Sequence, residues 1–432
     1  MTQTSFLPPD KPPPVTWTPT REAAAGRLKA FLPYAGSHYA RRRNFDYGPE
    51  DRSNVSALSP WVRHRLILEE DILRDTLTRH RFEDAEKFIQ EVFWRGYFKG
   101  WLKHRPHVWQ QYKKNLIQLV DRLEKDAVFA RGYDEAVTGK TGVTCFDMWA
   151  DELVQTGYLH NHARMWFASI WMFTLKLPWE LGADFFYRHL LDGDPASNTC
   201  SWRWVGGLHT VGKTYLARAS NIERFSQGRF NPVGQLATNA QALDEGALPE
   251  PSRQEPLKFV MQETMPAGAR IGFLITEEDC SPDRLVLPNT PEALFALVSP
   301  TRRSVLPTGH LAENFASDAV RNTARNAERQ FGAPLTLCEE EDFTDVLKDW
   351  TRALDLEFIV TPYLPVGPVR KRVHKACENL GIPLIEVRRD YDTLVWPHSK
   401  RGFFGLRKKI PGIITDLGLG YSFAKTFRAL VK

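Results

Sequence analysis

The sequence predicts a multidomain chain, with an all-α helical domain followed by an α/β domain of the Rossmann-like class. Two observations carry this prediction. In residues 20–232, apolar residues recur at i, i+3, i+4 and i+7, which is the spacing of amphipathic helices. In residues 257–432, short β-rich runs alternate with amphipathic helices, which is typical of a parallel, doubly wound sheet.

Two further segments complete the expected organisation. Residues 1–19 are expected to form an extended Pro-rich arm, since five prolines fall within residues 8–14. Thr20, followed by Glu22, predicts the start of the first helix. Residues 233–256 hold little large apolar content and several Pro, Gly and Ala, so we expect a linker there.

The same patterns locate the main elements. Helices of the first domain are expected at residues 23–36, 63–77, 81–102, 146–159 and 164–177. Strands of the second domain are expected at residues 270–276, 333–338, 356–362 and 382–388. Helices are expected between those strands at residues 318–332, 342–354 and 368–381.

Composition restricts the class of protein. The net charge is +5, which permits a polyanionic partner without requiring one. The 13 tryptophans are unusual and favour a ligand pocket or an interface. The five cysteines are scattered without CxxC spacing, so we expect reduced thiols in a cytoplasmic protein, no metal site and no iron–sulfur cluster. The polar N-terminus is unlike a signal peptide, and no apolar stretch approaches the ~20 residues of a membrane span.

Three segments of the helical domain carry charged and aromatic residues in a suggestive order. The first joins Tyr39, Arg43 and Asn44 to the small hydroxyl loop at residues 56–60, which precedes a predicted helix and suits a phosphate. Taken alone, that loop is equally an ordinary Ser-capped helix start. The second places Glu91, Trp94 and Arg95 on one helical face, where an intrahelical ion pair is the simpler interpretation.

The third segment, residues 139–204, is the longest and the most specific. Its ordered features are Gly139, Thr141, Gly142, Asp147, Leu153, Gly157, His160, Asn161, Arg164, Met165, Asp192, Asp194, Ala196, Asn198, Trp202 and Trp204. Together the three segments resemble the FAD-binding domain of the DNA photolyase and cryptochrome superfamily. The chain departs from the family pattern at Asn54-Val55, Gly96, Val143-Thr144 and His162.

The resemblance implies FAD as the cofactor. It implies that an Arg164–Asp192 pair holds the isoalloxazine ring and that Asn198 tunes its protonation. The cofactor-binding residues that it implies are Tyr39, Ser56, Ala57, Leu58, Ser59, Phe88, Glu91, Arg95, Asn161, Arg164, Asp192, Asp194 and Asn198.

The resemblance also assigns catalytic residues. Asn198 acts beside the flavin, while Trp202 and Trp179 match the proximal and middle members of an electron-transfer chain. The outer member falls near Asp126, which cannot serve, so Tyr133 or Trp109 could take its place. Core packing is the alternative role for these tryptophans.

Repair and signalling are the two functions of the superfamily. Cyclobutane-dimer photolyases flip a pyrimidine dimer onto the flavin, and the residues expected to contact it here are Glu91, Trp94, Asn161, Met165 and Trp204. All five are present, so the resemblance implies a light-driven deoxyribodipyrimidine photo-lyase whose partner is dimer-containing DNA. The alternative is a cryptochrome-like blue-light photoreceptor or redox flavoprotein with a signalling protein as partner.

The second domain resembles the antenna domain that precedes the flavin domain in photolyases, but here it follows. This similarity rests on residues 356–397. It allows for a second, antenna chromophore of unknown identity. A generic Rossmann-like domain fits the same strand–helix pattern.

Overall fold

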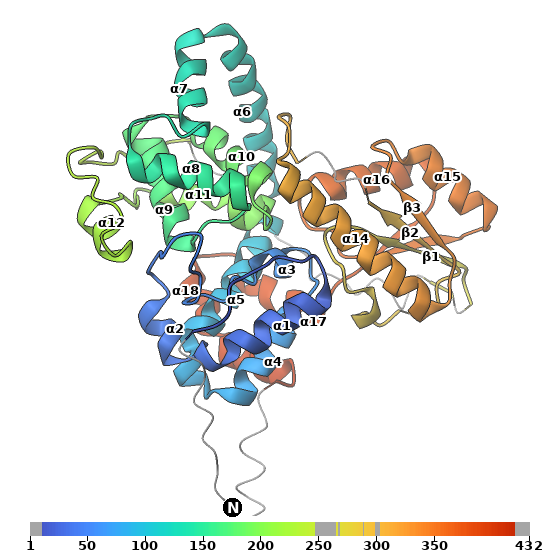
Figure 1. Ribbon diagram of the computed structural model, residues 1–432. Helices are drawn as coiled ribbons and strands as arrows, with labels where there is room; N and C mark the ends of the chain where they lie inside the picture. Colours follow the sequence, from blue (N-terminus) through green and yellow to red (C-terminus); the bar gives the residue numbers. More distant parts are fainter. Residues whose placement is uncertain (1–10, 247–264, 267, 288, 299–302, 420–432) are drawn as a thin grey trace, which may run out of the picture.

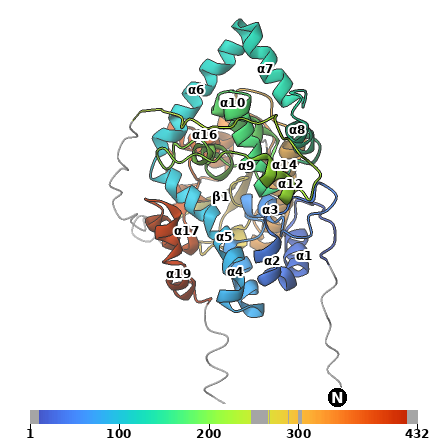
Figure 2. The same cartoon turned by 90° about the vertical axis from the view of Figure 1, so that its left-hand side faces the viewer.

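The computed structural model describes residues 11–246, 265–266, 268–287, 289–298 and 303–419. A helical region built mainly from the first half of the chain lies beside a smaller α/β region from the second half (Figure 1). α6 and α7 project from the helical region as a hairpin (Figure 2). Among the described residues, no helix is both long enough and apolar enough to cross a bilayer.

The helical region is formed by short and medium helices, as the apolar spacing predicts. Their bounds are α1 (Arg21–Phe31), α2 (Ser37–Arg42), α3 (Ser59–Arg63), α4 (Glu69–Arg79), α5 (Phe82–Lys103), α6 (Pro106–Lys125), α7 (Ala127–Val137), α8 (Thr144–Thr156), α9 (Asn161–Ser169), α10 (Trp179–His189), α11 (Trp202–Val205) and α12 (Ala219–Phe225). The predicted start of the first helix is confirmed, because the Thr20 side chain caps α1 by accepting from the Ala23 amide at 3.2 Å.

Two π-helical turns interrupt the regular α-helices beside the cavity that is described below. The helix expected over residues 164–177 instead ends as α9 at Ser169 and continues as the turn η2 (Ile170–Thr174). A second such turn, η3 (Pro195–Cys200), begins at Asp194, whose carboxylate accepts from the amides of Ala196 and Ser197. Wide turns of this kind are frequent at functional sites because they re-aim side chains.

The α/β region contains a five-stranded parallel sheet in the order β3-β2-β1-β4-β5. The strands are β1 (Ile271–Ile275), β2 (Ala293–Leu297), β3 (Leu335–Cys338), β4 (Phe358–Pro362) and β5 (Leu384–Val387). The helices that connect them include α14 (His310–Phe331), α15 (Thr344–Ala353) and α16 (Pro368–Leu380). The four expected strands are confirmed, and β2 is an additional strand that the sequence analysis did not identify.

Alternation along the strands explains how the sheet is covered on both faces. Ile271, Phe273 and Ile275 of β1 pack in one apolar cluster with α14, whereas Leu274 packs in another with α15 and α16. The cluster on the α14 side also contains residues of α1 and α3, such as Trp61. The sheet and the helical region therefore share this apolar cluster.

The last described helices return to the helical region. They are α17 (Asp390–Val395), α18 (Phe403–Arg407) and α19 (Ile410–Asp416), and Figure 2 shows α17 beside α5. Two glycines of α5 permit this close packing, because an added Cβ would lie 2.8 Å from Tyr391 at Gly96 and 2.8 Å from Ser399 at Gly100. The expected α/β domain at residues 257–432 thus ends in helices that belong by packing to the other region.

Part of the expected linker also packs on the helical region. Leu236 and Leu243 contact its core, and the Trp179 indole donates to Glu245 at 2.8 Å. Arg203 forms an ion pair with the same carboxylate. Residues 247–256 of that linker, residues 1–10 of the arm and the end of the chain after residue 419 lie outside the described residues.

Buried ion pairs join the helical region to the carboxyl edge of the sheet. Arg63 at the end of α3 makes a bidentate pair with Glu278, which follows β1, at 2.9 and 2.8 Å. Arg65 lies 3.4 Å from Asp279, which also follows β1. In open α/β sheets this edge is the usual ligand crevice. Here it contacts the helical region, and a second chromophore in the α/β region stays a prediction.

Candidate functional site

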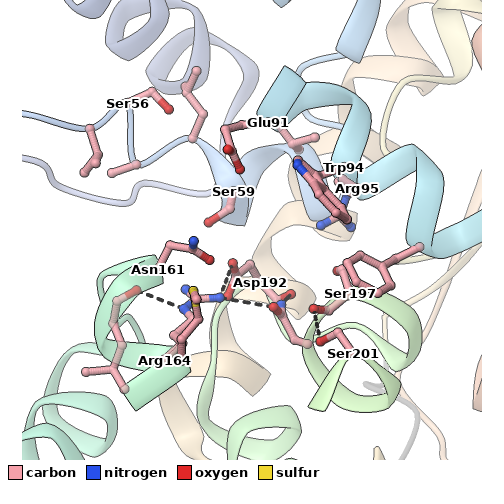
Figure 3. A pocket seen from close by; sticks show the side chains of 18 of the residues that line it. Ser56, Ser59, Glu91, Trp94, Arg95, Asn161, Arg164, Asp192, Ser197 and Ser201 are labelled. Atoms are coloured by element: carbon pink, nitrogen blue, oxygen red, sulfur yellow. Dashed lines mark hydrogen bonds and ion pairs between the residues drawn. The ribbon is translucent and has the colours of Figure 1, made fainter. Parts of the chain in front are cut away.

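A cavity of about 520 Å³ lies inside the helical region, where segments far apart in the sequence meet. Its size is within the range of small-molecule and cofactor sites, roughly 300–1,000 Å³. Figure 3 shows Ser59 and Glu91 on one side of the hollow and Asn161 and Arg164 on the other. Of the residues singled out in the sequence, those that line it are Tyr39, Arg43, Val55, Ser56, Ala57, Leu58, Ser59, Phe88, Glu91, Trp94, Arg95, Asn161, Arg164, Met165, Asp192, Asn198, Trp202 and Trp204.

Arg164 and Asp192 form the charged centre of the cavity. The Arg164 guanidinium donates to Asp192 Oδ2 at 2.9 Å and to Asn198 Oδ1 at 3.1 Å. Its Nε donates to the Leu159 carbonyl at 2.9 Å, which fixes the plane of the group. The Asn198 amide in turn donates to the Asp192 backbone carbonyl. These contacts hold three polar side chains in one orientation before any ligand arrives.

Asp194 supports the site from behind the wall. It is 1% exposed, is not a lining residue, and caps the turn η3 that carries Asn198. Burial alone would raise the pKa of its carboxyl group, but the positive charges of Arg95, Lys99 and Arg63 hold that pKa well below its usual value. Asp194 therefore remains ionised, and the structure places it in a supporting position rather than against a ligand.

The face of α5 presents the three side chains that its spacing predicts. Glu91, Trp94 and Arg95 all line the cavity. The expected alternative of an ion pair within the helix is not what forms: Glu91 pairs with Arg43 of the preceding loop, and Arg95 lies 3.4 Å from Asp194. Glu91 is thereby tied to a lining arginine, and Arg95 to the carboxylate behind the lining.

The loop before α3 is held rigidly. Arg27 of α1 donates to the carbonyls of Ser56 at 2.7 Å and Val55 at 2.9 Å. Ala57 adopts a left-handed backbone with φ 51°, a strained conformation of the kind found at ligand sites. The residue that caps α3 is Leu58, with no side-chain cap, so the Ser-capped start is not observed. A role for this loop in binding phosphate stays a prediction.

Two tryptophans of the cavity lining stack on other aromatic rings. Trp204 is 37% exposed and stacks against Tyr215, with ring centroids 5.7 Å apart. Trp94 stacks nearly parallel on Phe403 of α18, with centroids 3.7 Å apart and an interplanar angle of 11°. Both rings line the same cavity as Arg164 and Asp192.

Trp202 contacts Trp171, a tryptophan that the sequence did not single out. Trp202 lines the cavity and lies 6.3 Å from Trp171, which in turn lies 6.2 Å from Tyr133. Trp179 instead makes its ring contact with Tyr112 at 5.7 Å. The expected middle role of Trp179 therefore stays a prediction, and Trp171 is a competing member.

Other contributors were also missed, because they come from outside the recognised segments. Phe403 reaches Trp94 from more than 300 residues along the chain, and Arg63 donates to the carbonyl of Gly193 at 2.6 Å, between the two site aspartates. His162 points elsewhere: it stacks on Trp166 at 4.2 Å and contacts the Asn44 carbonyl at 2.8 Å. The sequence marks Phe403 only as one of two adjacent aromatics in a basic run, and Arg63 only as an arginine shortly after a Ser-Pro loop. Neither pattern is specific for a functional site.

The lining residues fit a flavin cofactor. Asp192 Oδ1 and Arg95 Nε are buried and have no hydrogen-bond partner among the described residues, so an acceptor and a donor remain for a ligand. Phe186 and Trp202 supply aromatic surface in the same wall. A buried charged pair beside flat apolar walls suits a planar, electron-rich ring.

Comparison with known proteins agrees with this fit. Residues 88–240 match the family described as the FAD binding domain of DNA photolyase. A deoxyribodipyrimidine photo-lyase of Thermus thermophilus is 33% identical over 46% of this chain and 45% of its own length. That of Synechococcus is 28% identical over 58% of this chain and 50% of its own length.

A solved structure is similar in part. It is a bacterial class III photolyase from Agrobacterium tumefaciens that is 27% identical in sequence. The match covers 49% of this chain and 43% of the photolyase chain, with a TM-score of 0.40. This chain thus spans about half the length of the curated relatives that it matches. Residues 88–240 of this chain are therefore similar to the FAD binding domain of DNA photolyase.

Proposed function

We propose that this protein is a light-driven, FAD-dependent DNA photolyase that repairs cyclobutane pyrimidine dimers in a cytoplasmic setting. The observation that carries the proposal is that one cavity is lined by all five residues expected to contact a dimer and, except for Asp194, by the residues expected to hold the flavin. The two sets share Glu91 and Asn161, and core packing alone would not gather them at one hollow, because packing does not require charged side chains there.

The residues of the chain have distinct tasks in this proposal. Arg164, fixed by Leu159 and Asp192, orients the ring system and balances negative charge on it. Asn198, held by Arg164, presents its amide at the ring edge. Reduced FAD, when bound, supplies the photoexcited electron that splits the cyclobutane ring.

The substrate side of the cavity clamps the flipped bases. Trp94 and Trp204 offer aromatic faces, and base stacking of this kind is worth about 1–3 kcal/mol per base. Glu91, Asn161 and Met165 contact the edges of the dimer in the proposal. Glu91 is oriented by its ion pair with Arg43.

The test is repair of a defined dimer in single- and double-stranded oligonucleotides by the reduced, FAD-loaded protein. We expect restored pyrimidines in blue light, none in the dark, and preferential binding of damaged over undamaged DNA. Trp204→Ala should weaken binding of the dimer and leave the FAD content unchanged. A flavin-loaded protein that neither binds nor repairs dimers contradicts the proposal and favours the photoreceptor alternative.

A further inference from the structure

A short basic and aromatic segment at residues 400–409 lies against the cavity residue Trp94. Its sequence, KRGFFGLRKK, contains five cations and no carboxylate. It includes α18, whose Phe403 stacks on the cavity residue Trp94. The segment is therefore adjacent to the site, although it is distant in sequence.

The two phenylalanines of the segment are in opposite environments. Phe403 is 5% exposed, whereas its neighbour Phe404 is 73% exposed. A large apolar ring in water costs free energy and is a frequent mark of a binding surface when cations surround it. Among the described residues, no atom beyond the chain neighbours lies within 4 Å of a Cβ placed at Gly402 or Gly405, so the backbone on both sides of the phenylalanine pair is open.

Contacts to α5 and α6 hold the segment in place. The Tyr97 hydroxyl donates to the Arg401 carbonyl at 2.9 Å, and Arg105 donates to the Lys400 carbonyl at 2.7 Å. Arg407 pairs with Glu86 at 3.0 Å. The backbone is thus fixed on the helical region, and the exposed side chains project from a rigid support.

The exposed cations are placed around Phe404. Lys400, Arg401, Lys408 and Lys409 are all exposed. Phe404 and Lys408 are four residues apart at α18, so they lie on one face of the helix. An aromatic ring with neighbouring cations matches a strand of nucleic acid, which presents base faces and a phosphate at each nucleotide.

We infer that residues 400–409 bind the DNA strand next to the flipped dimer, with Phe404 stacking on a flanking base and the exposed cations contacting phosphates. The inference rests on the proposed function, because it takes dimer-containing DNA as the occupant of the neighbouring cavity. Charge complementarity favours a polyanion, and the exposed ring between two glycines favours one with flat faces. An anionic membrane or an acidic protein would use the cations but would not require the stacked geometry.

The experiment measures binding of a dimer-containing oligonucleotide to the FAD-loaded full chain by fluorescence anisotropy over a series of salt concentrations. Phe404→Ala should weaken binding at least about 5-fold at every salt concentration, and Phe404→Trp should restore it. Lys408→Gln/Lys409→Gln should reduce the slope of log K against log salt by about 0.7–0.9 for each lost phosphate contact.

Matched controls come from the α/β region. Val286 is 87% exposed, and Val286→Ala removes apolar surface far from the cavity. Lys371→Gln/Lys375→Gln removes two exposed cations of α16. Both controls should bind like the wild type, and FAD content should be equal in every variant.

Two outcomes separate this inference from the proposed function. A wild-type protein without affinity for dimer DNA overturns both. Wild-type binding with unchanged affinity and salt slope in the Phe404 and Lys408/Lys409 variants overturns this inference alone. Loss of binding to phosphatidylserine vesicles in those variants, with DNA binding unchanged, would assign the segment to a membrane and overturn it as well.

Discussion

Glu278→Gln removes the carboxylate that supports the site from the α/β region. Arg63 and Glu278 are 1% and 4% exposed, and their two hydrogen bonds measure 2.9 and 2.8 Å. Burial by itself lowers the pKa of Arg63, but Glu278, Glu277 and Asp194 outweigh it and raise that pKa. The guanidinium thus stays charged after the substitution, without its main partner.

The expected loss of stability follows from that buried charge. Removing one partner of a buried pair costs about 3–5 kcal/mol. Arg63 keeps weaker contacts to Glu277 at 3.8 Å and Asp194 at 3.9 Å, so we expect the lower end, about 3 kcal/mol. The same arginine holds the Gly193 carbonyl at 2.6 Å, so the affinity for FAD should fall too.

The assay is urea unfolding of the full chain, with a parallel titration of FAD into apoprotein. Glu339→Gln is the control, because Glu339 and Arg321 form an exposed pair with 62% and 35% of their side chains accessible. That change should cost less than about 1 kcal/mol. If Glu278→Gln and Glu339→Gln have equal stability and equal affinity for FAD, the α/β region does not support the site.

Three further predictions concern packing, pH and electron transfer. Gly96→Ala places a Cβ 2.8 Å from the Tyr391 hydroxyl and should destabilise the protein by about 1–3 kcal/mol in thermal unfolding, whereas Gly26→Ala, with open space around it, should be neutral or stabilising. Burial, aided by a nearby carboxylate, raises the pKa of Glu152 to about 7 from 4.5, so the stability it contributes is complete below pH 4.5 and is lost as pH rises through 7. Glu152→Gln should therefore gain up to about 3 kcal/mol relative to the wild type between pH 4.5 and 8 in urea unfolding, and a constant difference would contradict this. Trp202→Phe should slow photoreduction of bound oxidised flavin in transient absorption while FAD is retained; an unchanged rate would exclude Trp202 as the proximal donor.

Much of the helical region could be predicted from local signals. Apolar spacing predicted α5, and a threonine before a charged first turn predicted the start of α1, because caps and periodicity are properties of neighbouring residues. The strand β2 was missed, although its five residues are all buried. A run as short as ALFAL is ambiguous without its partners, since strand pairing is decided by residues far away in sequence.

The sequence predicted which residues belong to the site, but not all of the contacts between them. The ordered residues of the third segment led to Arg164 and Asp192, which the structure brings into contact. The contact of Phe403 with Trp94 depends on the return of the chain to α5 through glycine contacts, which no local pattern encodes. The choice between Trp171 and Trp179 beside Trp202 depends on ring positions that helical spacing leaves open.

Light-dependent repair, measured side by side in wild type and Trp94→Ala, tests the central claim most directly. Both reduced proteins, loaded with equal FAD, receive the same dimer-containing oligonucleotide and the same dose of blue light. We predict that the wild type restores pyrimidines in light and none in the dark. Trp94→Ala should lose most of this repair activity, because Trp94 lines the cavity as a base-stacking surface. A flavin-loaded wild type that restores no pyrimidines in light would contradict the account.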